Sequence, residues 1–350
     1  MPAATAPASD VKAAQAEGLP PHVKLIEMGL ASWVSRILYA AAKLGIADAL
    51  ADVPRTAFEI AGPMKVHAPT LHRLLRTLAG LGILTEDNGH RFALTSLGQA
   101  LKTDAPGSAR ATLITLGGVG ETAWAEILFS LETGKSGFEK ATGLPLFAYL
   151  ASHPEEAALF SETMVGIHGR EPAAVAASYD FSNYNKIVDV GGATGNLIAA
   201  ILAKHSRPDG ILFDLPNGLI GASELLKERN VQDRVVIEPG DFFKSVPAGG
   251  DAYILSHIIH DFSEEQCVSI LGNCRRAMAS EGRVLIVEMV LPDGDTPHPG
   301  KVFDMMMLVL PGGQERTEDE YRDLLPKAGL QLSRILETGS DVSIVEAVAA

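Results

Sequence analysis

The sequence predicts an α/β protein in which a doubly wound sheet of seven strands follows a mostly helical N-terminal region. Two observations support this fold class. From Asn185 onward, short apolar strands alternate with helical patterns, which is typical of a parallel sheet covered by helices on both faces. Before that point, two helical segments and a hairpin follow one another in the order of a winged helix. A chain of 350 residues is long enough for both regions.

The overall charge argues against a protein that mainly binds nucleic acid phosphates. The chain has 29 basic and 43 acidic residues, which gives a net charge of −14. Its two cysteines, Cys267 and Cys274, share one predicted helix face, so we expect buried free thiols and no disulfide scaffold. This cysteine usage favours a reducing compartment, and we expect a cytoplasmic protein.

The N-terminal region begins with an Ala- and Pro-rich stretch, residues 1–18, for which we expect a disordered tail and no secretory signal. The first domain is predicted over residues 19–110. Within it, the segment Val23–Leu50 predicts one helix that is apolar nearly all round. Its charges at Glu27 and Arg36 argue against a membrane span, so we expect a buried helix and a homodimer that forms through this region.

The rest of this domain has the winged-helix pattern. Helices are predicted over Thr56–Ala61 and Ala68–Gly82, and a hairpin with a polar turn at Asp87-Asn88-Gly89 follows them. Basic side chains on and before the second helix keep open a role as a DNA-binding regulator: Lys65, His67, His72, Arg73 and Arg76. The acidic net charge and the lack of a basic stripe elsewhere favour packing or dimerisation instead.

Two further regions complete the predicted organisation. Residues 111–177 form a mostly helical connector with glycine interruptions at Gly117-Gly118 and Gly143, and residues 178–350 form the sheet domain. The seven strands are predicted at Lys186–Val190, Ile211–Phe213, Val235–Glu238, Ala252–Leu255, Arg283–Glu288, Leu330–Glu337 and Ser343–Val348.

The stretch Asp189–Asn196 predicts a ligand site at the carboxyl edge of the sheet. A buried strand runs into a glycine turn, with Gly191 and Gly195, and then into a helix, and such a turn lets the backbone approach a ligand closely. Ala193 and Asn196 occupy positions at which the dinucleotide motif G-x-G-x-x-G needs glycine. The turn alone does not identify the ligand, but this departure disfavours a dinucleotide.

Acidic positions near this turn sharpen the prediction. Asp214 ends the second strand, where a carboxylate can accept hydrogen bonds from both ribose hydroxyls of an adenosine. Asp241 and Phe242 follow the third strand and can bind the amino group and cover the face of an adenine. Asp189 is expected near a cationic centre, because a carboxylate is unfavourable beside a pyrophosphate. Together these positions favour S-adenosylmethionine over NAD.

The most specific sequence signal follows the fourth predicted strand. The run over residues 251–263 is D-A-Y-I-L-S-H-I-I-H-D-F-S, and later stretches are Val287-Glu288, Asp304–Met307 and Gly312–Thr317. Together they resemble the class I S-adenosylmethionine-dependent O-methyltransferases of the plant caffeic acid and acetylserotonin type, which have bacterial small-molecule relatives. The resemblance covers about residues 20–350. It implies a Rossmann-like methyltransferase domain and a winged-helix domain that serves dimerisation.

This resemblance assigns roles to individual residues. It implies that His260 is the general base and that Glu288 and Glu315 orient or support it. Asp261 would lie beside the methyl donor. The implied cofactor-binding residues are Asp189, Gly191, Gly195, Asp214, Leu215, Asp241, Phe242 and Ser256. At Ser256 and His257 the sequence departs from many plant members, which have lysine and tryptophan there.

Walls of the acceptor pocket are predicted on two helices. Met164 and His168 lie on the connector, and Met307 belongs to a run of methionines that suits either a pocket or a core. His257 and His260 are three residues apart, which would suit a metal site. No third ligand has suitable spacing, so we expect no metal.

These observations predict a homodimeric enzyme that transfers a methyl group from S-adenosylmethionine to a hydroxyl of a small aromatic molecule and releases S-adenosylhomocysteine. A phenol with a pKa near ~10 is mostly neutral at pH 7, and an imidazole with a pKa near ~6.5 can take its proton. A carboxylate on the other ring nitrogen would fix the tautomer. Two alternatives stay open: a relative that performs N- or C-methylation or another reaction, and a winged-helix transcriptional regulator. No nucleic acid or membrane partner is expected.

Overall fold

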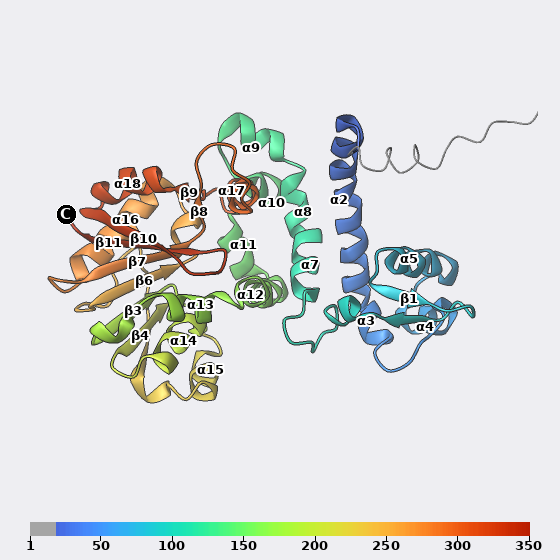
Figure 1. The fold of residues 1–350 in the computed structure, drawn as a ribbon, viewed down its shortest axis with the longest axis horizontal. Coiled ribbons are helices and arrows are strands. Elements are labelled where there is room, and N and C mark those ends of the chain that lie inside the picture. The colour runs from blue at the N-terminus through green and yellow to red at the C-terminus, as the bar shows by residue number, and fades with distance from the viewer. Residues whose placement is uncertain (1–18) are drawn as a thin grey trace, which may run out of the picture. The chain divides into compact units, whose positions relative to one another are not determined.

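The computed structural model describes residues 19–350, so the tail predicted over residues 1–18 lies outside the described residues. The described chain forms two compact units, residues 19–118 and residues 119–350 (Figure 1). The predicted connector is divided between them, because its first helix packs along the long helix of the first unit. Among the described residues, no helix has the length and apolar character needed to cross a membrane.

The first unit consists of helices and one hairpin. Its elements are α2 (Pro21–Leu44), α3 (Ile46–Ala49), α4 (Ala57–Met64), α5 (Ala68–Gly80), β1 (Leu84–Glu86), β2 (Phe92–Leu94), α6 (Ser96–Gln99) and α7 (Arg110–Gly117). Thr56 caps α4 through a capping box with Glu59, which explains why that helix begins where it does. The core contains Leu71, Leu75 and Leu78, which form the buried face of α5.

The long N-terminal helix differs from the prediction in one respect. The sequence predicted one helix over Val23–Leu50, but the chain breaks at Gly45, which adopts a left-handed conformation with φ of 66° and ends α2. The N-terminal half of α2 leaves large apolar side chains exposed within the single chain. They are Leu25, Ile26, Met28, Leu30 and Trp33. The apolar surface that predicted a dimer is therefore present, and no described part of this chain covers it.

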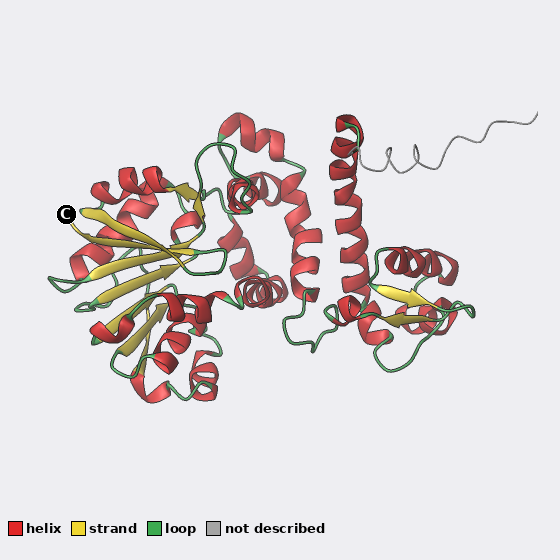
Figure 2. Cartoon of the chain, in the orientation of Figure 1, coloured by secondary structure: helices red, strands yellow, loops and turns green. Residues whose placement is uncertain are grey.

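The second unit combines a helical layer with the seven-stranded sheet (Figure 2). Its helices are α8 (Val119–Trp124), α9 (Ile127–Thr133), α10 (Gly137–Thr142), α11 (Leu146–Ser152), α12 (Pro154–His168), α13 (Glu171–Ser178), α14 (Asn196–Lys204), α15 (Ala222–Glu228), α16 (Glu264–Ala277), α17 (Gly300–Val309) and α18 (Glu318–Lys327), with short 3₁₀ turns at Phe181–Asn183, Gln232–Arg234 and Ile259–Asp261. The sheet contains β3 (Lys186–Val190), β4 (Asp209–Asp214), β5 (Val235–Pro239), β6 (Ala252–Ser256), β7 (Arg283–Glu288), β10 (Leu330–Glu337) and β11 (Ser343–Ala349), and β8 (Val290–Leu291) pairs separately with β9 (Arg316–Thr317).

The strand order is β10-β11-β7-β6-β3-β4-β5. All seven predicted strands are present, and their pairings are parallel except for those of β11. β11 runs antiparallel to β7, because a short turn with no crossover helix joins β10 directly to β11. β3 pairs with β4 on one side and with β6 on the other, so the chain crosses to the other part of the sheet there. The ends of β3, β4 and β6 therefore meet at one edge, where ligands bind in open α/β sheets.

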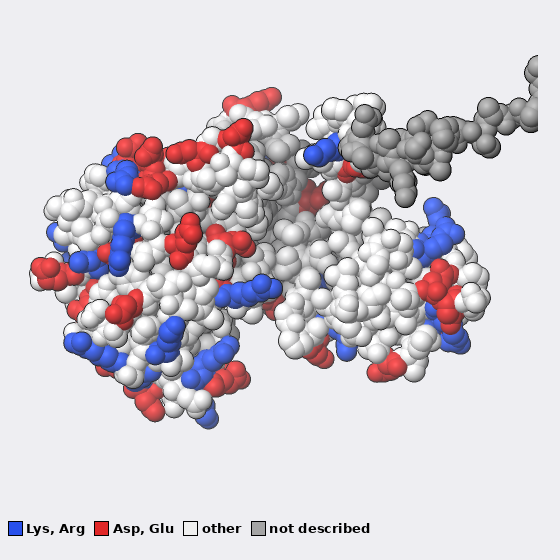
Figure 3. All heavy atoms as spheres, in the orientation of Figure 1, with Lys and Arg blue, Asp and Glu red and all other residues white. Residues whose placement is uncertain are grey.

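Alternating residues of the central strands build a core on each face of the sheet. Ile187 and Ile254 pack with α13, α14 and α15, whereas Val188 and Tyr253 face α16 and α18. Cys267 and Cys274 are both fully buried on α16, which confirms the predicted pair of free buried thiols. On the face of the second unit visible in Figure 3, acidic and basic side chains are interspersed.

Candidate active site

The end of β3 carries a buried and unpaired carboxylate. Asp189 is 1% exposed, and neither of its carboxylate oxygens makes a hydrogen bond of ordinary geometry with a described residue. Burial raises its pKa to about 7, against a weaker opposing effect of the Ile198 amide. A Cβ at Gly192 would lie 2.6 Å from Asp189 Oδ2, so only glycine fits beside this carboxylate. The site thus presents a negative group that lacks a cation.

Asp214 connects the end of β4 to the glycine turn. Its Oδ2 accepts a hydrogen bond of 2.9 Å from the Ala193 amide, and its Oδ1 accepts one of 2.6 Å from the Leu215 amide. Burial raises the pKa of Asp214, and these two amides oppose that rise. Because each oxygen keeps a second lone pair, the carboxylate can accept further hydrogen bonds while it holds the turn.

The next strand end adds the aromatic wall. Asp241 and Phe242 follow β5, and Asn273 fixes this loop by donating 2.7 Å and 3.1 Å hydrogen bonds to the carbonyls of Phe242 and Phe243. Gly191, at the start of the glycine turn, lies so close to Phe242 that a Cβ at this position would be 3.5 Å from the ring. The two segments that sequence reasoning assigned to the cofactor are therefore neighbours.

The short 3₁₀ turn Ile259–Asp261 places His260 at the same edge of the sheet, where β6 ends at Ser256. His260 is 6% exposed, and its Nδ1 lies 2.8 Å from Glu315 Oε1. Its Nε2 is 3.8 Å from Asp261 Oδ1, which is beyond hydrogen-bonding distance. The geometry leaves Nε2 as the ring nitrogen that is not hydrogen-bonded to a carboxylate.

The segment that carries Glu315 is held firmly against His260. The Gln314 amide donates a 2.9 Å hydrogen bond to the His260 carbonyl. A Cβ at Gly313 would collide with that same carbonyl, so the close approach requires glycine. Asp304 Oδ1 accepts a 3.0 Å hydrogen bond from the Glu315 amide, which anchors the other side of the segment.

Opposing effects act on the pKa of His260. Burial lowers it, but the negative charges of Asp261, Glu315 and Glu288 and the hydrogen bond to Glu315 outweigh burial and raise it to about 10. Burial also raises the pKa of Asp261 to about 6 and raises that of Glu315, while the charge of His260 opposes both shifts. The cluster therefore holds a proton tightly when no other cation is near.

Glu288 contacts the backbone of His260 and not its imidazole ring. Its Oε1 accepts a 3.0 Å hydrogen bond from the backbone amide of His260, and its Oε2 accepts one of 2.6 Å from the Tyr321 hydroxyl. It thus fixes the backbone that carries His260, whereas Glu315 alone bonds the ring. Sequence reasoning missed Tyr321, because a buried tyrosine on a helix 33 residues away gives no local signal.

Two family models match this chain. A model described as an O-methyltransferase domain matches residues 124–331, which is more than half of the chain. A model described as an O-methyltransferase dimerisation domain matches residues 26–104. The chain belongs to the O-methyltransferase family. It is therefore an S-adenosylmethionine-dependent methyltransferase.

Individual relatives match along nearly the whole chain. A phenazine O-methyltransferase of Lysobacter antibioticus is 44% identical over 92% of this chain and 95% of its own length. A phenazine-1-carboxylate N-methyltransferase of Pseudomonas aeruginosa is 30% identical over 93% of this chain and 97% of its own length. The relatives of this chain thus include enzymes named for methylation of oxygen and of nitrogen.

Solved structures agree with these relatives. The crystal structure titled LaPhzM has a TM-score of 0.90 and 43% identity, and the match covers 95% of this chain and 100% of that one. The O-methyltransferase NcsB1 from neocarzinostatin biosynthesis, solved with S-adenosylmethionine and 2-hydroxy-5-methyl naphthoic acid, has a TM-score of 0.81 and 33% identity, with 91% and 96% covered.

The residues of this methyltransferase fit the cofactor that its family uses. S-adenosylmethionine carries a positive charge, and Asp189 is a buried carboxylate without a cationic partner. The glycine turn leaves room where side chains would collide with Ile258 and Asp189. Asp189, Asp214 and Phe242, from three successive strand ends, would hold the donor.

A second group of titratable side chains lies beside His260. Glu171, at the start of α13, is bonded through Oε1 to His168 Nδ1 at 3.1 Å and through Oε2 to His257 Nε2 at 2.6 Å. The two imidazole rings are 3.8 Å apart, and the His257 ring lies 5.2 Å from that of His260. The sequence suggested no third ligand near His257, but Glu171 supplies a carboxylate from 86 residues away.

This second group fixes an unusual backbone conformation. His257 has a φ of 54°, in the left-handed region that β-carbon-bearing residues seldom adopt. Burial lowers its pKa to about 4, against the hydrogen bond that His257 donates to Glu171. Burial raises the pKa of Glu171, but the hydrogen bonds of the two histidines outweigh it and lower that pKa to about 2. A neutral His257 is thus held by an ionised Glu171 just before the 3₁₀ turn that carries His260.

The predicted acceptor-pocket residues lie on two helices. Met164 is half-buried on α12, whose last residue is His168. Met307 is buried on α17, and its carbonyl accepts hydrogen bonds from Gly312 and Gly313. That carbonyl therefore helps to fix the segment that approaches His260.

Proposed function

We propose that this methyltransferase methylates a hydroxyl group of a small aromatic acceptor and that His260 is the general base. The observation that supports this proposal most strongly is the buried His260–Glu315 pair, with a nitrogen–oxygen distance of 2.8 Å and a second ring nitrogen left unbonded. Nδ1 donates a hydrogen bond to Glu315, so in the neutral imidazole Nε2 presents a lone pair to the acceptor.

The chemistry follows from the residue types. The cofactor supplies an electrophilic methyl group, and the acceptor oxygen becomes a better nucleophile as it loses its proton. His260 Nε2 takes that proton, and Glu315 stabilises the imidazolium that forms. Glu288 and Tyr321 hold the backbone of His260 so that the ring keeps its position.

The charges around His260 support a sequence in which the donor binds before His260 acts as a base. The charge of Asp261 is the largest influence that raises the pKa of His260. A cation bound beside Asp261 would offset that charge, so His260 should reach its neutral form more readily after the donor has bound. We infer that His260 becomes an effective base in the complex with the donor.

The acceptor class rests on the named relatives. They are named for methylation of phenazines and of other small molecules, and one structure contains a hydroxylated naphthoic acid. We therefore propose a hydroxylated aromatic compound of secondary metabolism as the acceptor. The exposed apolar side chains of α2 and the matched dimerisation domain support a homodimer.

A panel assay tests the proposal. The purified protein is incubated with labelled S-adenosylmethionine and matched phenols and arylamines, and the products are identified by mass. The proposal predicts methyl ethers whose formation His260→Ala suppresses and His153→Ala, a matched exposed histidine in the same unit, leaves unchanged. Exclusive N-methylation of the arylamines would contradict it and would support the second class of relatives.

A further inference from the structure

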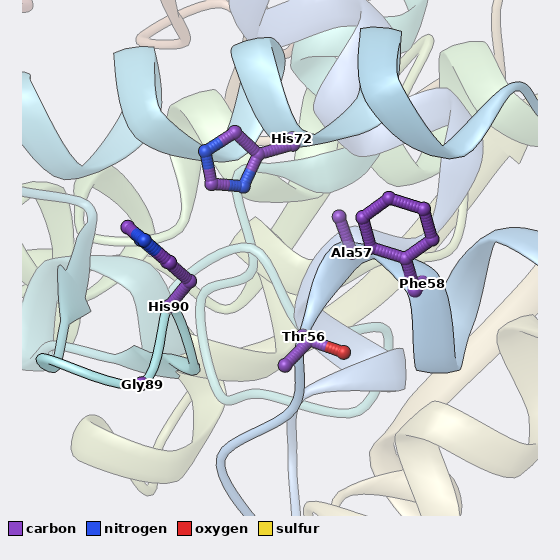
Figure 4. A pocket seen from close by; sticks show the side chains of 6 residues that line it. All are labelled: Thr56, Ala57, Phe58, His72, Gly89 and His90. Atoms are coloured by element: carbon purple, nitrogen blue, oxygen red, sulfur yellow. The ribbon is translucent and has the colours of Figure 1, made fainter.

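The first unit contains a cavity that plays no part in the proposed reaction. Its volume is about 350 Å³, and it lies between α4, α5 and the turn of the hairpin (Figure 4). The residues that line it are Thr56, Ala57, Phe58, His72, Gly89 and His90. In Figure 4 the imidazole rings of His72 and His90 lie beside each other in the wall of the cavity.

Three potential metal ligands converge at this cavity. His72 comes from α5, Glu86 from β1 and His90 from the turn that follows, and one ligand atom of each lies within 4.8 Å of the others. His90 Nδ1 is already 2.7 Å from Glu86 Oε1. Two imidazoles and one carboxylate form a donor set that suits divalent transition metals.

The ring geometry also suits a shared ion. The rings of His72 and His90 are 5.4 Å apart and meet at 86°, and one ligand atom from each lies within 4.8 Å of the other and of Glu86, so a single ion can contact all three side chains. The buried group around Glu171 has the same donor types, but its rings are stacked at 3.8 Å with an angle of 34°. There the carboxylate already bonds both imidazoles, and lone pairs of stacked rings do not converge as readily.

The surrounding structure holds these ligands in place before any ion binds. The His72 ring packs edge-on against Phe92, which is fully buried, at 5.6 Å. His90 has a φ of 56°, and Asp87 fixes its turn by accepting hydrogen bonds from the amides of Gly89 and Arg91. A non-glycine residue stays in this strained region only where its surroundings determine its conformation.

We propose that His72, Glu86 and His90 form a binding site for one divalent transition-metal ion, for which Zn²⁺ is the best match. Three protein ligands would leave a fourth position of the ion for water or a small ligand. The His90 side chain is 71% exposed and that of Glu86 is 23% exposed, so an ion reaches the site without any rearrangement of the core.

Metal titration of the full-length, metal-stripped protein tests this site. Zn²⁺ is measured by equilibrium dialysis, and Co²⁺ is used as a spectroscopic probe of the ligand geometry. We expect one ion per chain, and His90→Gly or Glu86→Gln should raise the dissociation constant at least ~10-fold, the lower bound known even for loss of an outer-shell partner. Glycine accepts the positive φ of residue 90, so the turn should keep its conformation.

Two matched variants make the outcome decisive. His67→Ala removes an exposed histidine just before the same helix and should leave Zn²⁺ binding unchanged. Glu171→Gln alters the buried histidine group and should also leave it unchanged. Equal binding by His90→Gly and the unmodified protein, or loss of the ion in Glu171→Gln, would overturn the proposal. Absence of stoichiometric binding would do so as well.

Discussion

Two histidine–glutamate pairs in this molecule have almost the same geometry and very different surroundings. His260 and Glu315 lie 2.8 Å apart with side-chain exposures of 8% and 1%, whereas His90 and Glu86 lie 2.7 Å apart with exposures of 71% and 23%. Contact distance therefore does not distinguish the pair that we propose to be catalytic from a surface pair. Burial does, because charges interact far more strongly away from water and because neighbouring groups then fix one tautomer.

The difference also shows in what each pair can bind. Around His260, Glu288 and the loop with Gly313 close the space from several sides, so the ring has one open nitrogen and a defined task. Around His90, solvent and a cavity remain beside the ring, so ions have access. The same residue types are thus proposed to transfer a proton in one unit and to bind a metal ion in the other.

The largest expected effect comes from removal of the buried imidazole. His260→Ala should lower kcat by roughly 10²–10⁴-fold, the usual scale for loss of a general base. Affinity for S-adenosylhomocysteine should change little, because this product lacks the positive charge of the donor and the proposed cofactor residues Asp189, Asp214 and Phe242 lie near the ends of β3, β4 and β5. Steady-state kinetics and calorimetry on the same preparation check both expectations, and a large loss of donor affinity would argue for a structural role of His260.

Glu315→Gln should have the next largest effect, about 10²-fold or more in kcat but no more than that of His260→Ala. The amide of glutamine can donate to Nδ1, which would place the proton on Nε2 and leave no base. Because Glu315 helps to raise the pKa of His260, its loss should also move the pH midpoint of kcat/KM downward. In the unmodified enzyme, kcat/KM should rise with pH above 6.5. A midpoint that stays fixed in the variant would contradict this coupling.

Sequence reasoning located these buried residues because they lie in continuous motifs. His260 and Asp261 belong to one run, and Glu315 lies in a glycine-rich segment that also stood out. Their distances could not be predicted, and Glu288 illustrates why. A carboxylate at a strand end can bond either a side chain or a backbone amide, and only tertiary packing decided that it bonds the His260 amide and Tyr321.

An effect of intermediate size is expected for Asp189, whose protonation should make donor affinity depend on pH. Burial raises its pKa to about 7, so below that pH the group is protonated and a cationic donor must bind with loss of the proton. Donor affinity should therefore rise with pH between 5.5 and 7, by up to ~10-fold per pH unit, and then level off. Asp189→Asn should weaken binding at pH 7 and flatten this dependence in calorimetric titrations. An unchanged slope would assign the dependence to another group, such as Asp214.

The residue groups that sequence reasoning missed are those assembled from distant segments. Glu171 meets His257 across 86 residues, and no spacing rule connects a helix start to a strand end. The sequence indicated His72 only as one basic residue of a helix, although its ring lies 5.4 Å from that of His90 in the structure. The break at Gly45 was missed for a different reason, because the apolar pattern continues through a glycine that ends the helix.

The smallest expected effect belongs to the exposed pair. His90→Gly relieves a left-handed conformation that costs ~1–2 kcal/mol, but glycine loses ~0.5–1 kcal/mol through its greater freedom in the unfolded chain. The free energy of unfolding should therefore change by less than ~1 kcal/mol in urea denaturation of the metal-free protein. A larger loss would show that this exposed pair contributes to the stability of the first unit.

The central claim is that His260 takes the proton of the acceptor, and a series of acceptors with graded acidity tests it most directly. Methyl transfer is measured for the unmodified enzyme and for His260→Ala with phenols of similar shape whose pKa values fall from ~10 toward the assay pH. The account predicts that the defect of His260→Ala shrinks steadily as the phenol becomes more acidic, because the phenolate then forms without a base. A defect of constant size across the series, or near-normal turnover of the least acidic phenol by His260→Ala, would contradict it.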